Sequence, residues 1–457
     1  MKMQQGKTFK TLFAAVLAAV IMQADNASAQ ITQSADEAVK GMRVGWNYGN
    51  ALDGNSGDVN NMWIEKWTDR SPAAYETAWG QKQASPKLFQ MLHDAGFNAV
   101  RVPVTWYPHM KGKKWKLNNL TWSPTDDPIS SKVDADWMAR VKEVVDQVLA
   151  SGMYCIINVH HDTGAASTAW IRANGNTFSA KKSLYEALWK QIAEEFKGYG
   201  DHLLFEGYNE MLDGYSSWCF ASFAASGQYN QTSAEDSYKA INDYAQTFVN
   251  TVRATGGNNS TRNLIVNTYG SCDGRGNWNS HLVEPLSKMK LPADKAKGHL
   301  IFEVHTYPDM KNLQNARNEV DAEFSSLKKN LVSKGAPVII GEWGASDGTG
   351  YDTDYKNNLL EFAKYFVAKA KKENVATFYW MGISDGADRA VPRFTQADLR
   401  DAIIKGYYGD GGYTAVSAPA VSSVKKSNVI YNILGQRVDD FSKPGLYIVN
   451  GKKVLKK

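Results

Sequence analysis

Two glutamates stand directly after apolar segments, where carboxylates can take part in acid–base chemistry. Glu210 ends the run Leu-Leu-Phe-Glu-Gly-Tyr-Asn-Glu, and Glu342 lies between two glycines in Val-Ile-Ile-Gly-Glu-Trp-Gly. Glycine lets a ligand approach the backbone closely, and partial burial favours the protonated carboxyl that a general acid needs. Taken singly, each residue also fits an ordinary salt-bridged glutamate, and Glu206 in the same run could equally be the buried one.

A pair of carboxylates has a defined use in the hydrolysis of glycosidic bonds. In retaining enzymes the two carboxyl groups lie about 5–5.5 Å apart, one acting as nucleophile and the other as acid and then base. Glu210 and Glu342 are far apart in the sequence. They can form such a pair only if the fold places the two strands across from each other.

Three further side chains have the chemistry to support the pair. Arg101, in Val-Arg-Val-Pro, would hold Glu342 ionised and orient it by charge-assisted hydrogen bonds. His305 and Tyr307 are two residues apart, and hence lie on one side of an extended strand. Tyr307 could donate its hydroxyl to the nucleophile, while His305 could orient a carboxylate or the sugar.

His160 and His161 are followed by Asp162, which raises the question of a metal site. Neighbouring residues on a strand point in opposite directions, so both histidines would rarely bind one ion. We therefore favour contacts with sugar hydroxyls and support of the carboxylates, and expect no metal and no cofactor. Trp380, in Phe-Tyr-Trp-Met-Gly, could form a platform beneath the sugar at the cleavage point.

The chain is rich in aromatic residues, with 14 Trp and 22 Tyr. Flat aromatic rings bind the apolar faces of sugars, although a tryptophan can equally be a core residue. Helical spacing around Trp189 favours the core. Several tryptophans in polar, glycine-rich or asparagine-rich surroundings are candidate sugar contacts: Trp63, Trp67, Trp79, Trp106, Trp115, Trp122, Trp170 and Trp218.

Eight short apolar runs alternate with helical patterns, as expected for parallel strands that are covered on both faces. The expected strands are Arg43–Asn47, Ala99–Pro103, Tyr154–His160, Leu203–Asn209, Leu264–Thr268, Ile301–His305, Pro337–Gly341 and Thr377–Met381. Helices are expected at Pro86–Ala95, Asp136–Ala150, Leu184–Lys197, Tyr238–Thr255 and Leu359–Lys371. This order predicts the α/β class, a (β/α)₈ TIM barrel with a short C-terminal β-rich tail.

The barrel prediction explains where the polar residues lie. Active sites of such barrels form at the carboxyl ends of the strands. Polar and aromatic residues gather at those ends: Trp46, Asn47, Arg101, His160, His161, Asn209, Glu210, Asn267, His305, Tyr307, Glu342 and Trp380. A purely structural protein would have no reason to place them there.

The two ends of the chain differ from its middle. Three lysines precede the apolar stretch Leu12–Met22, and Ala-Ser-Ala at 27–29 is typical of a cleavage site, so residues 1–29 are predicted to be a signal peptide. This stretch is too short to span a membrane. We expect the barrel domain over residues 30–411, a linker over 412–424 and a small β tail over 425–457, with a hairpin turn at Asn450-Gly451.

Composition excludes some partners. The net charge of +5 is small for 457 residues and the basic residues are dispersed, which argues against a nucleic-acid-binding protein. Three cysteines cannot form a disulfide framework. Cys155 is expected to be a core residue, and a bridge between Cys219 and Cys272 is left open.

The motifs together resemble glycoside hydrolase family 5. They are Gly45-Trp-Asn-Tyr-Gly-Asn-Ala-Leu-Asp, Gly96-Phe-Asn-Ala-Val-Arg-Val-Pro-Val, Asn158-Val-His-His, Tyr208-Asn-Glu, His305-Thr-Tyr and Ile340-Gly-Glu-Trp-Gly. The resemblance covers most of residues 41–382. It implies Glu210 as the acid/base and Glu342 as the nucleophile. It also implies that Asn209 binds the sugar 2-hydroxyl and that Asn47, Arg101, His160, His161, His305, Tyr307 and Trp380 lie in the active site.

The opening motif is similar to the branch that acts on β-1,4-glucans such as cellulose, mixed-linkage glucan and xyloglucan. Met211 stands after Asn209-Glu210 where proline is commoner, which bears on the substrate rather than on the chemistry. The resemblance therefore implies a retaining endo-β-1,4-glucanase with a β-glucan as its partner. A mannanase or xylanase on the same scaffold, or a non-catalytic carbohydrate-binding barrel, remain alternatives.

The C-terminal segment resembles the sorting domain of Bacteroidetes-type secretion, in Gly435-Gln-Arg-Val and Gly445-Leu-Tyr-Ile-Val-Asn-Gly-Lys-Lys. This implies passage through an outer-membrane secretion machinery to the medium or the cell surface. An accessory β-domain is the alternative. We expect a secreted or surface-attached monomer without a membrane span.

Overall fold

The computed structural model describes two compact units, which are treated separately: residues up to Tyr413 and residues from Thr414 onward. The described residues are 31–55, 71–110, 115–118, 121–124, 131–165, 169–218, 220–223, 228–274, 285–344, 353–380, 392–411, 413, 430–432, 437–438, 445–449 and 452–456. The predicted signal peptide, the predicted linker apart from residue 413, and the residues at the expected hairpin turn lie outside them. No helix in this part of the chain is long and apolar enough to cross a membrane.

Eight parallel strands close into a barrel in the order β1-β10-β9-β8-β7-β6-β5-β2. They are β1 (Val44–Asn47), β2 (Ala99–Val102), β5 (Tyr154–Asn158), β6 (Leu203–Glu206), β7 (Leu264–Asn267), β8 (Leu300–Thr306), β9 (Val338–Trp343) and β10 (Ala376–Tyr379). This confirms the predicted (β/α)₈ barrel.

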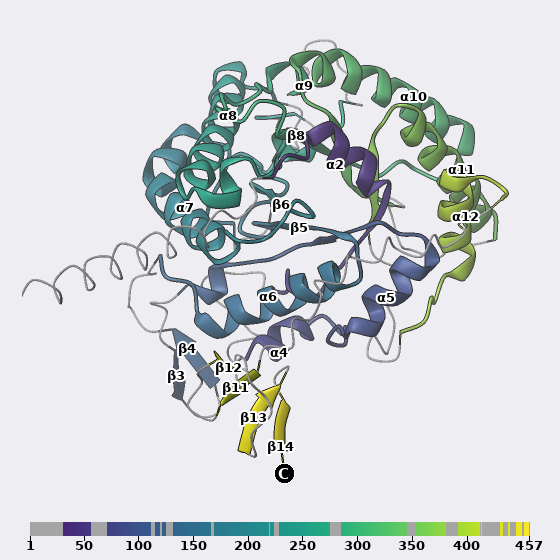
Figure 1. The fold of residues 1–457 in the computed structure, drawn as a ribbon. Coiled ribbons are helices and arrows are strands. Elements are labelled where there is room, and N and C mark those ends of the chain that lie inside the picture. Colours follow the sequence, from purple (N-terminus) through teal and green to yellow (C-terminus); the bar gives the residue numbers. More distant parts are fainter. Residues whose placement is uncertain are drawn as a thin grey trace, which may run out of the picture. The chain divides into compact units, whose positions relative to one another are not determined.

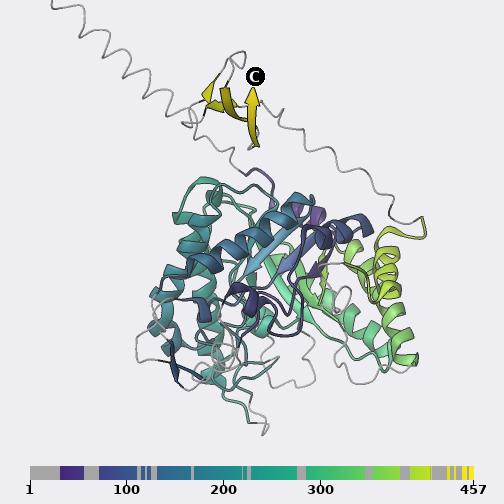
Figure 2. The same cartoon turned by 90° about the horizontal axis from the view of Figure 1, so that it is seen from below.

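Helices surround the barrel (Figure 1 and Figure 2). They are α4 (Pro72–Glu76), α5 (Pro86–Ala95), α6 (Ala135–Ala150), α7 (Gly175–Glu195), α8 (Gln231–Ala254), α9 (Pro285–Lys288), α10 (Leu313–Asn330), α11 (Thr353–Lys372) and α12 (Ala397–Tyr408). Four of the five predicted helices begin earlier than expected, because their first turns are polar and carry little hydrophobic periodicity. Side-chain caps mark the true starts of two of them, at Asn174 and Asn230.

Several predicted strands end earlier than expected, most clearly β6. The strand expected to reach Asn209 ends at Glu206, since its last ladder bond runs from Gly207 N to Ile265 O. The chain then leaves the sheet, and Asn209 N donates to Val159 O instead. Glu210 therefore lies four residues beyond β6 in a pinned loop rather than at the strand end itself.

The amino end of the barrel is filled by an apolar layer and closed by helix α2 (Ala35–Met42). The helix begins with a capping box formed by Ser34 and Glu37, which fixes its entry. Its apolar face packs on one inward residue from each of several strands: Ala99, Ile156, Leu204, Ile265, Ile301 and Ile339. This layer makes the lower half of the barrel a packed core.

A polar layer lies directly above the apolar one because side chains alternate along a strand. Two residues beyond each apolar residue stand Arg101, Asn158, Glu206, Asn267, Glu303 and Gly341. The five side chains of this set are fully buried. The intervening residues, such as Val100, Ile157 and Phe205, belong to the second core, between the barrel and its helices. The barrel interior therefore changes from an apolar layer to an ionic layer over two residues along each of these strands.

A β-bulge at Gly341 gives β9 its special geometry. Val304 is paired with Ile340, yet the next residue, His305, is paired with Glu342. Strict alternation would send Glu342 outward toward the helices. The extra residue instead turns Glu342 to the same side as His305, as bulges often do next to active sites.

A separate four-stranded antiparallel sheet forms the C-terminal unit, in the order β12-β11-β13-β14. Its strands are β11 (Ile430–Asn432), β12 (Arg437–Val438), β13 (Gly445–Val449) and β14 (Lys452–Lys456). Val449 is paired with Lys452, the register expected for a hairpin with a two-residue turn. A small hairpin that the sequence analysis did not foresee, β3 (Trp115–Asn118) with β4 (Thr121–Pro124), belongs to the larger unit.

The bulge makes Gly341 sensitive to substitution. A Cβ at this position would overlap Glu303 Oε1, whereas a Cβ at Gly344 would make an ordinary 3.6 Å contact with the Tyr307 ring. We expect Gly341→Ala to lower the free energy of unfolding by about 1–3 kcal/mol through overpacking. Gly344→Ala should have a much smaller effect. Urea unfolding of both variants measures this, and equal losses would contradict the role given to the bulge.

Candidate active site

Arg101 is the centre of the polar layer and is fully buried. Its guanidinium donates to both oxygens of Glu206, at 2.6 and 2.7 Å, which is the bidentate geometry that arginine favours. It also donates to Glu342 Oε1 at 2.8 Å and to Asn209 Oδ1 at 2.8 Å. Burial would lower the pKa of Arg101, but the surrounding carboxylates outweigh this and raise it well above its usual value. Arg101 is therefore a permanent cation that anchors both strand β9 at Glu342 and the loop that carries Glu210.

Glu342 is held on both oxygens. Oε1 accepts from Arg101, and Oε2 accepts from the Tyr307 hydroxyl at 2.6 Å. Burial and the neighbouring Glu342 raise the pKa of Tyr307 well above its usual value, so the hydroxyl keeps its proton and remains a donor. The Glu342 side chain is only 5% exposed. It is thus an oriented carboxylate at the floor of the site.

Glu210 lies beside Glu342 and shares a histidine with it. His305 Nδ1 is 2.9 Å from Glu210 Oε1 and 3.5 Å from Glu342 Oε2. One ring nitrogen of His305 and one carboxylate oxygen from each glutamate all lie within 4.8 Å of one another. The Glu210 side chain is 22% exposed, which makes it the more accessible member of the pair. The fold therefore joins the two glutamates that the sequence singled out.

His305 is held at both ring nitrogens, since Nε2 lies 3.3 Å from Glu303 Oε1. Burial by itself would lower the pKa of His305, but Glu342, Glu210 and Glu303 outweigh it and raise the pKa to about 10. An imidazolium has two donors and no acceptor, which matches carboxyl oxygens on both sides. His305 is therefore a second fixed cation between the glutamates.

Asn47 and Asn209 reach the site in different ways. Asn47 is fully buried, its amide nitrogen donating to the carbonyls of Gly341, Phe378 and Tyr379 and its oxygen accepting from Arg101. Asn47 thus ties β1 to the bulge next to Glu342. Asn209 also accepts from Arg101, through Oδ1, which fixes the loop that carries Glu210.

His160 and His161 lie past the end of β5, so the alternation expected of strand residues does not apply to them. Their rings are 4.5 Å apart, which corrects the expectation that they point in opposite directions. His160 stacks on Trp380 with ring planes 9° apart, and His161 lies 3.8 Å from the buried Asp53. Asp53, His160 and His161 are spaced closely enough to hold a metal ion. Burial lowers the pKa of both histidines, which keeps the rings neutral.

Asp162, the third residue of that motif, serves the scaffold instead. Its oxygens accept from the backbone N–H groups of Trp106 and Tyr107 and from the indole of Trp170. Burial raises its pKa to about 6. Asp162 thus joins the loops that follow β2 and β5.

The tryptophans divide between core and surface. Trp106, Trp170 and Trp189 are buried, so the first two are core residues rather than the sugar contacts considered from the sequence, and Trp189 is a core residue as predicted. Trp79 lies against His161, with ring centroids 5.6 Å apart, and Trp218 is 48% exposed. The side chains of Trp63, Trp67, Trp115 and Trp122 lie outside the described part of the structure.

Sequence reasoning assigned no role to most of the buried polar layer. Glu206 was considered only as an alternative to Glu210, Asn158 was named only within a motif, Asn267 was placed at a strand end without a role, and Glu303 was not singled out. Asn158 and Asn267 both donate to Glu206 Oε1, at 2.9 and 3.3 Å. The sequence does contain a pattern that could have indicated Glu303. It precedes His305 by two residues and therefore lies on the same face of the strand.

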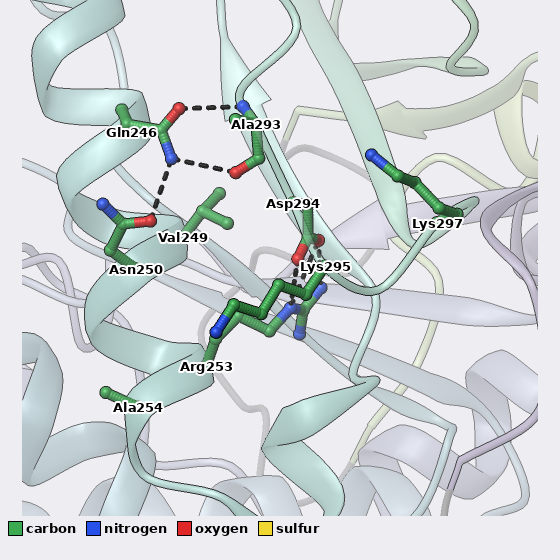
Figure 3. Close-up of a pocket in the computed structure, with 9 residues that line it drawn as sticks. All are labelled: Gln246, Val249, Asn250, Arg253, Ala254, Ala293, Asp294, Lys295 and Lys297. Carbon is green, nitrogen blue, oxygen red and sulfur yellow. Dashed lines mark hydrogen bonds and ion pairs between the residues drawn. The ribbon is translucent and has the colours of Figure 1, made fainter.

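A groove of about 800 Å³ lies elsewhere, between α8 and residues 293–297 (Figure 3). These segments precede β7 and β8, so the groove is at the amino ends of the strands, away from the glutamates. Arg253 is paired there with Asp294, and Gln246 bonds the backbone of Ala293. These interactions fasten the 291–297 loop to the helix.

Comparison with known proteins supports the geometry. The family model for cellulase (glycosyl hydrolase family 5) matches residues 59–386. Endoglucanase B of Neocallimastix patriciarum is 30% identical over 360 residues, or 76% of this chain and 64% of that protein, so the chain spans just under two thirds of this relative.

Two solved structures are also similar. A GH5-4 broad-specificity endoglucanase from an uncultured bacterium is 49% identical, with a TM-score of 0.75 over 85% of this chain and 99% of that one. A family 5 glycoside hydrolase of Prevotella bryantii, in complex with a xyloglucan tetradecasaccharide, is 37% identical, with a TM-score of 0.69 over 83% of this chain and 100% of that one. The matched segment, the closed barrel and these relatives together show that the chain belongs to glycosyl hydrolase family 5, the cellulase family, and is a glycosidase.

Proposed function

We propose that this protein is a retaining endo-β-1,4-glucanase with Glu342 as nucleophile and Glu210 as acid and then base. The observation that carries the proposal is a pair of carboxylates that share His305, with one oxygen of each lying within 4.8 Å of the other. Retaining enzymes keep their carboxyl groups about 5–5.5 Å apart, whereas inverting enzymes leave about 6.5–9.5 Å for a water molecule. The close pair supports double displacement.

The environments of the two glutamates support this division of roles. Glu342 receives hydrogen bonds from Arg101 and Tyr307, which hold a carboxylate ionised and aimed at one point. As the glycosyl–enzyme bond forms on one oxygen, the charge on Glu342 disappears, and Arg101 still has Glu206 as a partner. Glu210 is more exposed and is hydrogen-bonded to His305, so it can exchange a proton with the leaving oxygen and later with water.

The residues around the pair would hold the sugar. Trp380 stacks on His160 and can present its other face to a pyranose ring. His160 and His161 are neutral and can exchange hydrogen bonds with hydroxyl groups. The Asn209 oxygen is used by Arg101, which leaves the amide nitrogen for the 2-hydroxyl. The side-chain amide of Asn47 is already hydrogen-bonded within the protein, so Asn47 would act by positioning Arg101 rather than by contacting the sugar.

The substrate class follows from the relatives. One similar enzyme is described as a broad-specificity endoglucanase, and another was solved with a xyloglucan oligosaccharide. We propose cellulose, mixed-linkage glucan and xyloglucan as substrates, and a protein that is exported and acts outside the cell.

The role of each glutamate can be tested with a small external nucleophile. We expect Glu342→Ala to lower kcat on lichenan on the order of 10⁴-fold. Azide should then restore turnover of an activated β-glucoside and yield the α-glucosyl azide. Glu210→Ala with azide should yield the β-glucosyl azide, because Glu342 still forms the glycosyl–enzyme. NMR of the products reads the configuration, and exchanged products would reverse the assignment.

The substrate proposal predicts a pattern of products. Purified enzyme should release oligosaccharides of mixed length from carboxymethylcellulose, lichenan and xyloglucan, with a rapid fall in viscosity that shows cleavage inside the chain. Xylan and mannan should be cleaved far more slowly. Preferential cleavage of mannan or xylan would replace the assignment, and binding without release of reducing ends would indicate a non-catalytic barrel.

The C-terminal unit supports a role in export. Its four strands form a unit separate from the barrel, and its sequence resembles the sorting domain described above. Deletion of residues 414–457 should leave kcat on lichenan unchanged and retain the enzyme inside a Bacteroidetes host. Activity assays on medium and cell fractions measure this, and normal export of the truncated chain would favour an accessory domain.

A further inference from the structure

Glu303 is a buried carboxyl group that the proposed chemistry leaves without a role. It lies on β8 in the polar layer of the barrel and is fully buried. Oε1 lies 3.3 Å from His305 Nε2 and 3.3 Å from Arg101 Nε. It also occupies the space above Gly341, where a Cβ would overlap it. Glu303 thus reaches the two catalytic carboxylates through His305 and Arg101.

Its second oxygen has an unusual environment. Glu303 Oε2 is buried and has no hydrogen-bond partner among the described residues. On the neighbouring strand β7, Asn267 is the register partner of Glu303, and its Oδ1 is likewise buried without a partner in this part of the chain. Two acceptor atoms without donors therefore belong to side chains that are neighbours across the ladder. Buried polar atoms of this kind are rare in proteins.

Turning the Asn267 amide would not remove the problem. Its Nδ2 donates to Glu206 Oε1 at 3.3 Å and to Ser271 Oγ at 3.1 Å. A flipped amide would place its oxygen against the Glu206 carboxylate. The orientation is therefore fixed by Glu206, and Glu303, the register partner of Asn267, is placed to supply the missing donor.

The charges around Glu303 agree with a proton on it. The titratable groups that face it are Arg101 from β2, Glu206 from β6 and His305 from β8 itself, with Glu342 and Glu210 beyond them. Glu206 lies at hydrogen-bond distance from both Nε and Nη2 of Arg101, so Glu303 interacts with that cation more weakly than Glu206 does. Burial, and then the Glu206 charge, raise the pKa of Glu303 to about 8.

We propose that Glu303 is a positioning residue that works as a neutral carboxylic acid, donating its proton from Oε2 to Asn267 Oδ1 and accepting from His305 Nε2 on Oε1. With Oε1 fixed in this way, the His305 imidazolium is held at one nitrogen by Glu303, while the other serves Glu210 and Glu342. The consequence for catalysis rests on the proposed function of that pair. The protonation of Glu303 does not, and it is tested without substrate.

Linkage between protonation and stability gives the first test. A glutamate in the unfolded chain titrates near 4.5, whereas Glu303 in the fold titrates near 8. Between these values the native state holds a proton that the unfolded chain has lost, so wild-type stability falls as pH rises. Glu303→Gln keeps an acceptor for His305 and a donor for Asn267 and cannot ionise. We expect the Tm of E303Q minus that of wild type to rise steadily from pH 5 to pH 8.

Glu76→Gln is the matched control, because Glu76 is also fully buried but lies outside the site. Burial would raise the pKa of Glu76, but its paired hydrogen bonds with Arg140 outweigh this and lower it. The Tm difference between E76Q and wild type should therefore stay constant from pH 5 to pH 8. A flat profile for E303Q as well would mean that Glu303 is ionised in the fold and would overturn the proposal.

Infrared spectroscopy and kinetics complete the test. The difference spectrum of wild type minus E303Q at pH 7 should contain the C=O stretching band of a protonated carboxylic acid.

Glu303→Leu should have a kcat on lichenan about tenfold below that of E303Q with little change in KM, since it displaces the catalytic pair rather than the substrate. A carboxylate band without a carboxylic acid band would show that Glu303 is ionised and would refute the neutral acid. Equal kcat values in the two variants would refute its positioning role. If wild type were inactive, the thermal and infrared results would still decide the protonation of Glu303.

Discussion

The buried charge of Arg101 is the constraint on which the site depends. A guanidinium taken out of water must be matched by carboxylates at short range, or the fold loses several kcal/mol. Glu206 supplies that match with two parallel hydrogen bonds, and Glu342 and Asn209 take the remaining donors on Nη1 and Nη2, together with Asn47. The same interactions that stabilise the cation therefore fix the position of Glu342, the proposed nucleophile, and of the loop that carries Glu210.

The pleat of the barrel explains why these groups meet. Alternation places apolar residues, among them Leu204, Ile265 and Ile301, in the lower layer and polar residues two positions later in the layer above. The apolar layer, sealed by α2, excludes water from below. Above it, charges interact in a medium of low dielectric, where hydrogen bonds between fixed groups are strong but unmatched ones are costly. At Gly341 the alternation is broken, and the bulge brings Glu342 to the side of His305.

Much of this organisation is readable from the sequence. Eight apolar runs with polar residues at their carboxyl ends predicted the barrel and brought Glu210, Glu342, Arg101, His305 and Tyr307 together, because strand order and direction decide where strand ends lie. The ends of strands were less predictable: whether the chain leaves the sheet at Glu206 or at Asn209 depends on hydrogen bonds to β7, which a single segment does not contain. For the same reason, the expectation that His160 and His161 point in opposite directions was wrong. Glu303 was missed and Asn267 was given no role, because a polar residue inside an apolar strand gains a role only from its neighbours across the ladder.

The balance of charge connects these observations. Arg101 and His305 bring two positive charges into the barrel, and Glu206 and Glu342 bring two negative charges that contact them directly. If Glu210 carries a proton for the leaving group, the set is neutral only when Glu303 is neutral as well. An ionised Glu303 would add a buried charge next to Glu206 and would compete for the same two cations. A carboxylic acid at this position keeps the two cations directed at Glu342 and Glu210, while its hydrogen bonds still fix the histidine between them. Glu303, which acts through His305 and Arg101, therefore determines how strongly Glu210 and Glu342 are held.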